Sequence, residues 1–294
     1  MPVNRAPGTR ARRALLLSIL LLAASVAMGG GTANASPTPV GLGTATSFAI
    51  RASSQITDVP PSPITGDVGL SPASGTFDGL TCAEVNAGAG PIYAVDTLGP
   101  QACPGTNNLG LMTTVRSDAL AAFTHTAALP GATPIAGESL TGLTLDPGIY
   151  SFGHLATGNI SSGGTLTLNA HGDPNAVWIF QASSDIIMLS TSTVAFINAP
   201  AGSDLACNVF WTAVTSASID TGSTFVGTIM TGASITMAAG STVHGRLLAG
   251  NGATGLVSLD HDTIIRPTGC AALAAGTGGG PRPTVVVGTP ALTG

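Results

Sequence analysis

The sequence predicts an all-β protein with one long helix, in which short strands stack as the coils of a β-solenoid. Three observations support this prediction: the composition, a repeat at a fixed offset, and two kinds of strand. Of the 294 residues, 8% are charged, 44% are hydrophobic and 40 are glycine. Lysine is absent and only two of the acids are glutamate, whereas helix-rich proteins use Glu, Lys, Leu and Arg. This composition favours strands joined by many tight turns.

The internal repeat indicates how the strands are arranged. Residues 222–230 (GSTFVGTIM) match residues 240–248 (GSTVHGRLL) at an offset of 18 residues, and looser echoes span 165–180 and 193–211. A strand repeat of about 18 residues is the length of one solenoid coil. Two hairpins are the alternative, but hairpins favour Asn-Gly or Asp-Gly turns, which are rare here.

The repeating coils contain two kinds of strand. Strands of the first kind are apolar on both faces, and they cover residues 176–180, 209–211, 225–230 and 243–248. Strands of the second kind alternate apolar residues with hydroxyls, and they cover residues 165–169, 216–220 and 234–238. The first kind needs cover on both sides, whereas the second kind has one face in solvent.

Residues 109–129 are predicted to form a helix that supplies this cover. Asn107 or Asn108 can cap its start, and Pro130-Gly131 ends it. Its apolar stripe at helical spacing consists of Leu111, Val115, Ala119, Ala122 and Phe123. A helix lying along one side of the solenoid would cover the strands that are apolar on both faces.

The two ends of the chain differ from its centre. Residues 1–35 have the pattern of a signal peptide: four arginines, an apolar segment over 14–27, and Ala33-Asn34-Ala35 before Ser36. The apolar segment is short for a membrane span, although an uncleaved anchor is the alternative. We therefore expect a secreted, extracellular protein without a membrane segment. The Gly/Pro-rich residues 271–294 are predicted to be a flexible tail, which leaves a folded domain over 36–270.

Export makes disulfides plausible for the four cysteines. Four cysteines allow three connectivities, of which we favour Cys82–Cys103 and Cys207–Cys270, because Cys82 and Cys103 flank one local Gly/Pro-rich loop. The C-x2-C spacing of zinc sites is absent, so we expect no metal.

Charge and motif content exclude several classes of function. After residue 13 the chain holds five arginines against 14 acids, so it could not neutralise the phosphates of a nucleic acid. Nucleophile motifs and phosphate-binding loops are absent, and the carboxylates share no spacing. The one dense polar cluster, Asp260-His261-Asp262, is interpreted as a turn. We expect neither an enzyme nor a cofactor.

Six segments, taken in order, resemble one family. They are LGTATSFAI (42–50), ITGDVGLSP (64–72), LDPGIYSF (145–152), GDPNAVWIFQ (172–181), ACNVFW (206–211) and GSTFVG (222–227). On these residues the chain resembles the DUF3494-type ice-binding proteins of bacteria and fungi. The resemblance implies a discontinuous right-handed β-solenoid with one helix packed along it. It also implies that the N-terminal strands, about 42–80, pair beside the C-terminal coils.

The resemblance further implies binding to ice through a flat solenoid face, with loops of the form T-A/G-x-T/N. Residues 221–224 (TGST) fit this form, residues 231–234 (TGAS) nearly fit, and residues 251–254 (NGAT) fit loosely. Stacked strands repeat every ~4.8 Å, which is close to oxygen spacings in ice. The predicted ice-contacting residues, which alternate with or flank buried apolar residues, are Thr165, Thr167, Ser216, Ser218, Thr221, Thr224, Ser234 and Thr236.

We therefore expect a monomer whose partner is the ice surface. Two other functions stay open. The first is an adhesive or structural surface module without ice affinity, whose sequence would look almost the same. The second is a carbohydrate-active solenoid enzyme, which would need clustered carboxylates that this sequence lacks.

Overall fold

The computed structural model describes residues 36–72, 76–88, 90–95, 108–154, 158–252 and 254–280. Contacts divide the chain into two units, Met1–Ala33 and Asn34–Gly294, and the described residues all belong to the second. The predicted signal peptide and residues 281–294 of the predicted tail lie outside the described residues. None of the helices in the described part of the chain has the length and hydropathy needed to cross a membrane.

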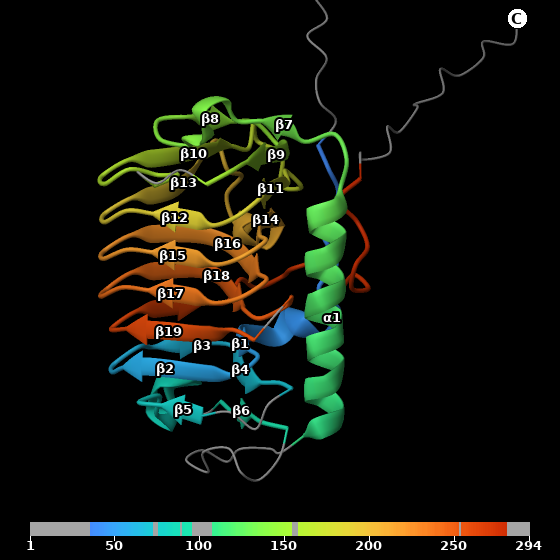
Figure 1. The fold of residues 1–294 in the computed structure, drawn as a ribbon. Coiled ribbons are helices and arrows are strands. Elements are labelled where there is room, and N and C mark those ends of the chain that lie inside the picture. The colour runs from blue at the N-terminus through green and yellow to red at the C-terminus, as the bar shows by residue number, and fades with distance from the viewer. Residues whose placement is uncertain are drawn as a thin grey trace, which may run out of the picture. The chain divides into compact units, whose positions relative to one another are not determined.

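The strands of the described residues form a 14-stranded and a six-stranded sheet, and their pairings are parallel, as in a β-solenoid. The six-stranded sheet, here called the open sheet, consists of β12 (Ile186–Met188), β15 (Ala217–Ile219), β17 (Ile235–Met237), β19 (Leu256–Asp260), β2 (Gln55–Val59) and β5 (Thr76–Asp78). It is the layer nearest the viewer in Figure 1.

The 14-stranded sheet forms the other two sides of the coils, because β16 (Thr224–Thr231) and β18 (Thr242–Leu248) run through both. The N-terminal end of β16 pairs with β13, whereas its C-terminal half pairs with β14. The strands beside β14, called the helix side, are β7 (Thr133–Pro134), β9 (Gly148–Phe152), β11 (Trp178–Ala182), β14 (Val209–Ala213), β1 (Phe48–Ala52), β4 (Asp67–Leu70) and β6 (Ile92–Tyr93). The strands of the remaining side, called the third side, are β8 (Thr144–Leu145), β10 (Thr165–Asn169), β13 (Thr193–Ile197), β20 (Thr263–Ile265) and β3 (Ile64–Thr65).

The coils differ in length. Thr224 pairs with Thr242, which is the predicted offset of 18 residues, but Trp178 pairs with Val209, 31 residues away. The longer coil contains the excursion 198–208, which includes the short helix η5 (Leu205–Asn208). The predicted length therefore applies to one pair of coils and not to the whole solenoid, and the right-handed winding stays a prediction.

The solenoid is discontinuous in sequence. β1 lies between β18 and β4, and β2 lies between β19 and β5. The N-terminal coil thus stacks on the C-terminal coils, and Ile56 pairs with Val257 across some 200 residues of sequence. Figure 1 shows the blue strands directly below the red ones, as the pairing expected for the N-terminal strands requires.

Helix α1 (Leu109–Ala128) stands along the helix side, close to its predicted bounds (Figure 1). The Asn108 side chain caps it by accepting a hydrogen bond from the Leu111 backbone N–H at 2.9 Å. Its buried residues are Met112, Val115, Ala119, Ala122 and Thr126, whereas the predicted Leu111 and Phe123 are half-buried. The buried stripe is thus rotated slightly from the predicted one, because Met112 and Thr126 also face the sheet.

Two cores hold this arrangement. One lies between α1 and the helix side, where Val177, Ile179, Phe210 and Met230 meet the helix. The other fills the inside of the coils, where four aromatic rings stack across successive strands. Their centroid separations are 5.7 Å for Tyr150–Phe180, 3.7 Å for Phe180–Trp211 and 4.9 Å for Trp211–Phe225. The strands that were predicted to be apolar on both faces are therefore the ones that separate two cores.

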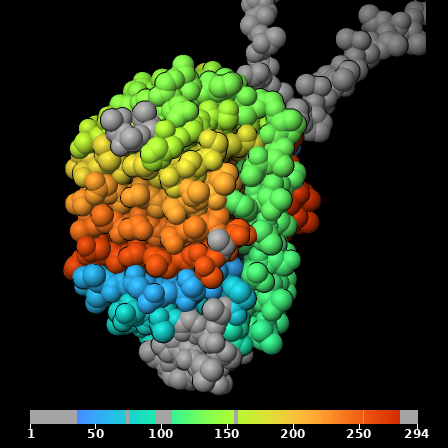
Figure 2. All heavy atoms as spheres, in the orientation of Figure 1, coloured from blue at the N-terminus to red at the C-terminus, as the bar shows by residue number. Residues whose placement is uncertain are grey.

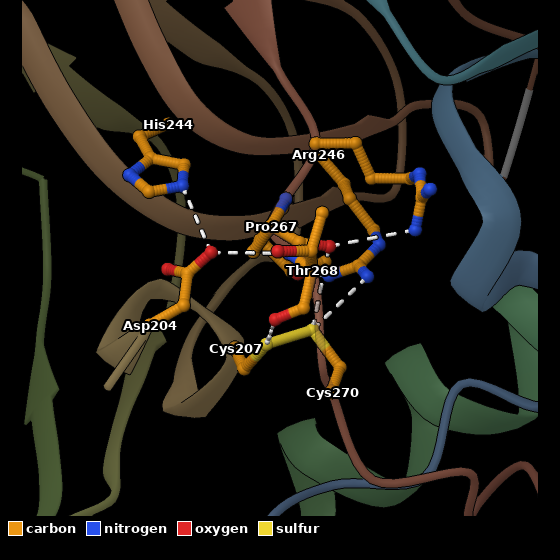
Figure 3. Close-up of polar contacts among 9 residues, drawn as sticks. Asp204, Cys207, His244, Arg246, Pro267, Thr268 and Cys270 are labelled. Carbon is orange, nitrogen blue, oxygen red and sulfur yellow. Dashed lines mark hydrogen bonds and ion pairs between the residues drawn. A yellow bond between two sulfur atoms is a disulfide. The ribbon is translucent and has the colours of Figure 1, made fainter. Parts of the chain in front are cut away.

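The predicted Cys207–Cys270 disulfide is present and ties the η5 excursion to the segment after β20. Figure 3 shows Asp204 beside it, accepting hydrogen bonds from His244 Nε2 at 3.2 Å and from the Thr268 backbone N–H at 3.0 Å. Cys103 lies outside the described residues, so the pairing of Cys82 with Cys103 stays a prediction.

The segment after the disulfide is packed rather than free. The Gly41 N–H donates to the Thr277 carbonyl at 2.8 Å, the Thr38 N–H donates to the Gly280 carbonyl at 2.9 Å, and His125 Nε2 lies 2.7 Å from the Gly278 carbonyl oxygen. The hydrogen-bonded part of the chain therefore extends past the predicted boundary at residue 270, because these residues bind the N-terminal segment and His125 of α1.

Candidate functional site

The open sheet carries a row of hydroxyl side chains on its outer face. Ser218 pairs with Thr236, Thr236 with Ser258, and Ser258 with Thr57, so the four lie side by side on neighbouring strands. Ser218 and Thr236 are exposed, and the residues on either side of each are buried. The Thr57 hydroxyl donates to the Ser258 hydroxyl at 3.0 Å. We call these four residues the hydroxyl row.

The row crosses the junction of the two chain segments. In Figure 2 the strands of this face form successive bands, and the red band of β19 meets the blue band of β2. Ser258 and Thr57 belong to these two strands. Ile187 and Asp78 continue the row at its ends, so that the hydroxyls in between form an uncharged strip.

A second row lies where each coil turns from the open sheet to the third side. Consecutive register pairs run from β10 through β13, β16 and β18 to β20. The paired residues, which we call the threonine row, are Thr165, Thr193, Thr224, Thr242 and Thr263. Each of them is exposed or half-buried. Five identical β-branched side chains therefore stack at the strand spacing along one corner.

The corner turns share a local conformation that explains this regularity. Two residues before Thr224 and Thr242, Gly222 and Gly240 have φ of 67° and 76°, in the left-handed region that favours glycine. Thr191 and His261 adopt the same region at the equivalent positions before Thr193 and Thr263. The residue between is buried in each case: Ser192, Ser223, Ser241 and Asp262. Each corner thus consists, in chain order, of a residue in the left-handed region, a buried polar residue and an outward-facing threonine.

The structure divides the eight predicted site residues between two sheets. Ser218 and Thr236 lie in the hydroxyl row, and Thr224 and Thr165 lie in the threonine row. Thr167 lies further along β10. The prediction that Thr165 and Thr167 share one face with Ser216, Ser218, Ser234 and Thr236 is therefore wrong, because alternation tells which side of a strand a residue occupies but not which sheet the strand joins.

The other three predicted residues lie at the margins. Thr221 is exposed at a corner turn. Ser216 and Ser234 are half-buried: the Ser216 N–H donates to Asp185 at 3.1 Å, and the Ser234 hydroxyl accepts from the Leu256 N–H at 3.2 Å. They hold the start of their strands rather than projecting from the sheet.

In two of the three predicted T-A/G-x-T/N loops, the first residue does not face outward. Residues 221–224 lie at the corner that carries the threonine row. Thr231 and Asn251, in contrast, are buried at the opposite corner, beside the helix side. The Thr231 hydroxyl donates to the Ala233 carbonyl at 2.8 Å, and Asn251 Oδ1 accepts from buried Arg51 at 3.1 Å. Both side chains serve the interior and cannot contact a flat surface.

Sequence reasoning missed the residues that complete both rows. Ser258 and Thr57 come from chain segments that meet only at the junction. Thr193, Thr242 and Thr263 had a usable signal, because each follows a serine or aspartate in a short motif, as in Gly240-Ser241-Thr242 and His261-Asp262-Thr263.

Carboxylates border the hydroxyl row without entering it. Burial alone would raise the pKa of Asp185, but hydrogen bonds from Thr215 and the Ser216 N–H outweigh it and hold the pKa below its ordinary value. The Thr221 N–H and the Ser190 hydroxyl lower the pKa of Asp220 in the same way. Both stay ionised and hydrogen-bonded, so the strip between them keeps an uncharged, small-side-chain surface.

The Asp260-His261-Asp262 cluster has a structural role. Asp262 is fully buried, and its carboxylate accepts the N–H groups of Ser241 and Asp260, each at 2.8 Å. His261 Nδ1 lies 2.6 Å from Asp260 Oδ1 at the surface. Within the described residues, no group of three or more His, Cys, Asp or Glu side chains is arranged to hold a metal ion.

The profile of the family described as Ice-binding-like matches residues 50–265. An ice-binding protein of Colwellia sp is 35% identical over 241 residues, covering 81% of this chain and 88% of that protein. The crystal structure of an ice binding protein from an Antarctic biological consortium has a TM-score of 0.63 at 31% identity, covering 78% of this chain and 92% of that chain. The DUF3494 domain of Shewanella frigidimarina ice-binding protein 1 has a TM-score of 0.65 at 26% identity, covering 79% and 99%.

Proposed function

Because the chain belongs to the Ice-binding-like family, we propose that it binds ice crystals and acts as an antifreeze and ice-recrystallisation-inhibiting protein. Its relatives and the solved structures named above are ice-binding proteins. We further propose that the contact surface consists of the hydroxyl row and the threonine row. The observation that carries this assignment is the unbroken register of small uncharged side chains across neighbouring strands.

The physical argument starts from spacing. Parallel strands repeat every ~4.8 Å, so side chains in register present hydroxyls at a regular interval close to that of oxygen atoms in ice. A threonine also presents a methyl group, beside which water can order without being bound as tightly as by a charge. A charged side chain would keep its own hydration shell and separate the lattice from the sheet.

Stiffness is the second requirement. β-Branched side chains have few rotamers, so little conformational entropy is lost when water orders against them. Strands β15 and β17, which carry Ser218 and Thr236, are also held in place. Their residues Ile219, Ile235 and Met237 point into the core and are at most 2% exposed. The surface that meets ice would therefore be organised before contact.

We propose that the protein is non-catalytic, secreted and monomeric. The pattern of residues 1–35 and the Cys207–Cys270 disulfide support export. The carboxylates that could have suggested hydrolysis, Asp185, Asp220 and Asp262, accept hydrogen bonds from backbone N–H groups of their own turn or of a neighbouring coil. A surface module without ice affinity is the second candidate, and its mature chain would be exported in the same way.

The test is the growth of a single ice crystal in a solution of the purified mature protein. We expect a faceted crystal, a gap between the melting and growth temperatures, and ice grains that stay small during annealing. A crystal that grows as a round disk, with grains that coarsen as in buffer, would refute ice binding and favour the surface module.

A further inference from the structure

A column of buried polar side chains lies directly behind the threonine row. It contains one residue from each of five successive coils, and each is at most 1% exposed. Its members are Ser192, Ser223, Ser241, Asp262 and Ser62. Buried hydroxyls and carboxylates are costly unless they are hydrogen-bonded, so a column of them inside an apolar core needs a reason.

The reason lies in the backbone of the corner turns. The Ser223 N–H donates to the Ser241 hydroxyl at 3.3 Å, the Ser241 N–H to Asp262 Oδ1 at 2.8 Å, and the Asp262 N–H to the Ser62 hydroxyl at 3.0 Å. In each case the column side chain of one coil accepts the N–H of the column residue in the preceding coil. In these three pairs of coils the column therefore satisfies inward-facing backbone N–H groups and links one coil to the next.

The same residues fix the threonines. Thr224, Thr242 and Thr263 follow column residues directly in the chain. Their N–H groups donate to the carbonyls of the column residues one coil earlier, as from Thr242 to Ser223 at 2.8 Å and from Thr263 to Ser241 at 2.9 Å. Each of these members of the threonine row is thus held by two column residues. One precedes it directly in the chain, and the other lies in the preceding coil and accepts its N–H.

Asp262 occupies the place where this column crosses the chain junction. Its Oδ1 accepts a hydrogen bond from the Ser241 N–H of the preceding coil, and its Oδ2 accepts one from the Asp260 N–H at 2.8 Å. Its own N–H donates to the Ser62 hydroxyl in the N-terminal coil. Ser62 in turn donates to Asp58 Oδ1 at 2.6 Å. A serine has a single oxygen, whereas the carboxylate satisfies two N–H groups at once.

We propose that Asp262 is a positioning residue for ice binding, which keeps the threonine row and the hydroxyl row in register across the junction. This inference rests on the proposed function. The N-terminal coil is held there by contacts between residues about 200 apart in sequence, such as the pairing of Ser258 with Thr57. Without a fixed register, Thr57 and Thr263 would no longer continue the spacing set by the central coils.

The charged and titratable groups around this junction are few. Glu84 accepts the Ser62 N–H at 2.7 Å, Asp58 accepts the Ser62 hydroxyl, and Asp260 and His261 lie in the same turn as Asp262. A substitution at Asp262 therefore changes the acceptor at this position, while Glu84, Asp58 and His261 keep the hydrogen-bond partners named above. Asp262→Asn keeps the shape but places an NH2 group against a backbone N–H, whereas Asp262→Ser restores the residue type of the adjacent coils.

The experiment measures thermal hysteresis, which is the gap between the melting and growth temperatures of an ice crystal and is called the freezing gap below. It is measured for purified variants at a temperature where circular dichroism shows each of them folded. We expect Asp262→Asn, which turns a donor toward a backbone N–H, to lose more than half of the wild-type gap. Asp262→Ser, which keeps one acceptor oxygen and leaves the other N–H without one, should lose less than Asp262→Asn. Ser241→Ala, which removes the acceptor for the Ser223 N–H, should also lose more than half. If Ser241→Ala does not fold, the pair at Asp262 decides.

Two controls separate positioning from stability. Ile179→Ala truncates the core under α1, far from the column, and should lower the melting temperature without reducing the gap. Thr212→Val removes another buried hydroxyl, which has no hydrogen-bond partner in the described structure, and should lower neither the melting temperature nor the gap. The inference is overturned if Asp262→Asn keeps the full gap, or if the gap merely follows the melting temperature in all variants, Ile179→Ala included. A wild-type protein without any gap would refute the proposed function instead.

Discussion

Thr224 and Thr228 lie four residues apart on β16, yet the two threonines have opposite environments. Thr224 is exposed in the threonine row. Thr228 is fully buried on the helix side, where its hydroxyl accepts a hydrogen bond from Arg246 Nη1 at 3.3 Å. The same side chain is thus a surface group on one side of the solenoid and an internal acceptor on the other. What covers a strand, and not its residue types, decides the role of its side chains.

The same contrast divides the whole molecule. On the helix side all five residues of β14 are buried, because both of its faces contact a core. On the open sheet the central residues of β15 and β17 are exposed. The covered strands hold the fold together, and the open strands are left free to contact a surface. Substitutions should therefore affect stability on one side and ice binding on the other.

The largest effect on stability is expected on the covered side. Phe210 is 1% exposed between β14 and α1, so Phe210→Ala should lower the free energy of unfolding by about 3–5 kcal/mol through lost burial and a cavity. Thermal unfolding measures this loss. Well below its melting temperature the variant should still facet ice. A folded Phe210→Ala protein that grows round crystals would show that the covered side also contributes to binding.

A smaller effect on stability is expected from pH, and it differs between the buried carboxyls of the junction and the carboxyls that border the hydroxyl row. Burial raises the pKa of Asp262 to about 6, and burial together with Glu84 raises that of Asp58 to about 6. Both groups bind a proton more tightly in the folded than in the unfolded chain, whose ordinary pKa is 3.8. Between about pH 4 and 6 they therefore make the unfolding free energy fall as pH rises. Asp185 and Asp220, which border the hydroxyl row, have lowered pKa values. At lower pH they therefore make the unfolding free energy rise as pH rises.

Melting temperatures at pH 5 and pH 7 measure this dependence. The protein should melt at a lower temperature at pH 7 than at pH 5, and Asp262→Ser should show a smaller difference. An equal or higher melting temperature at pH 7 would mean that burial does not raise the pKa values of Asp262 and Asp58 in the folded protein.

The sequence was informative where a pattern repeats along the chain. The stripe from Val115 to Ala122 predicted the helix, and the runs of apolar residues in β14, β16 and β18 predicted strands between two cores. Both signals are local, since each depends on spacing within one element. The Cys207–Cys270 pair was also predicted, because Cys82 and Cys103 flank one local loop and the other two cysteines were left to pair.

The composition of the site was less accessible to sequence reasoning. Thr165 and Ser218 lie on different sheets, although both alternate with buried residues in the same way. The row Ser218, Thr236, Ser258, Thr57 exists only because two distant segments pair at the junction, which no local period records. The left-handed turn residues and the buried serines that follow them were visible in sequence, but their shared geometry appears only once the coils are stacked.

The most direct test of the account compares the same substitution on the two kinds of exposed surface. Thr236→Tyr puts a bulky ring at the centre of the hydroxyl row, whereas Thr113→Tyr puts it on the outer face of α1, where Thr113 is also exposed. Both changes should alter the unfolding free energy by at most about 0.5 kcal/mol, because neither side chain is buried. The measurement is the freezing gap at equal protein concentration. We predict that Thr236→Tyr abolishes the gap and Thr113→Tyr leaves it intact; a folded Thr236→Tyr protein with the full wild-type gap would contradict the assignment of the open sheet as the ice-binding surface.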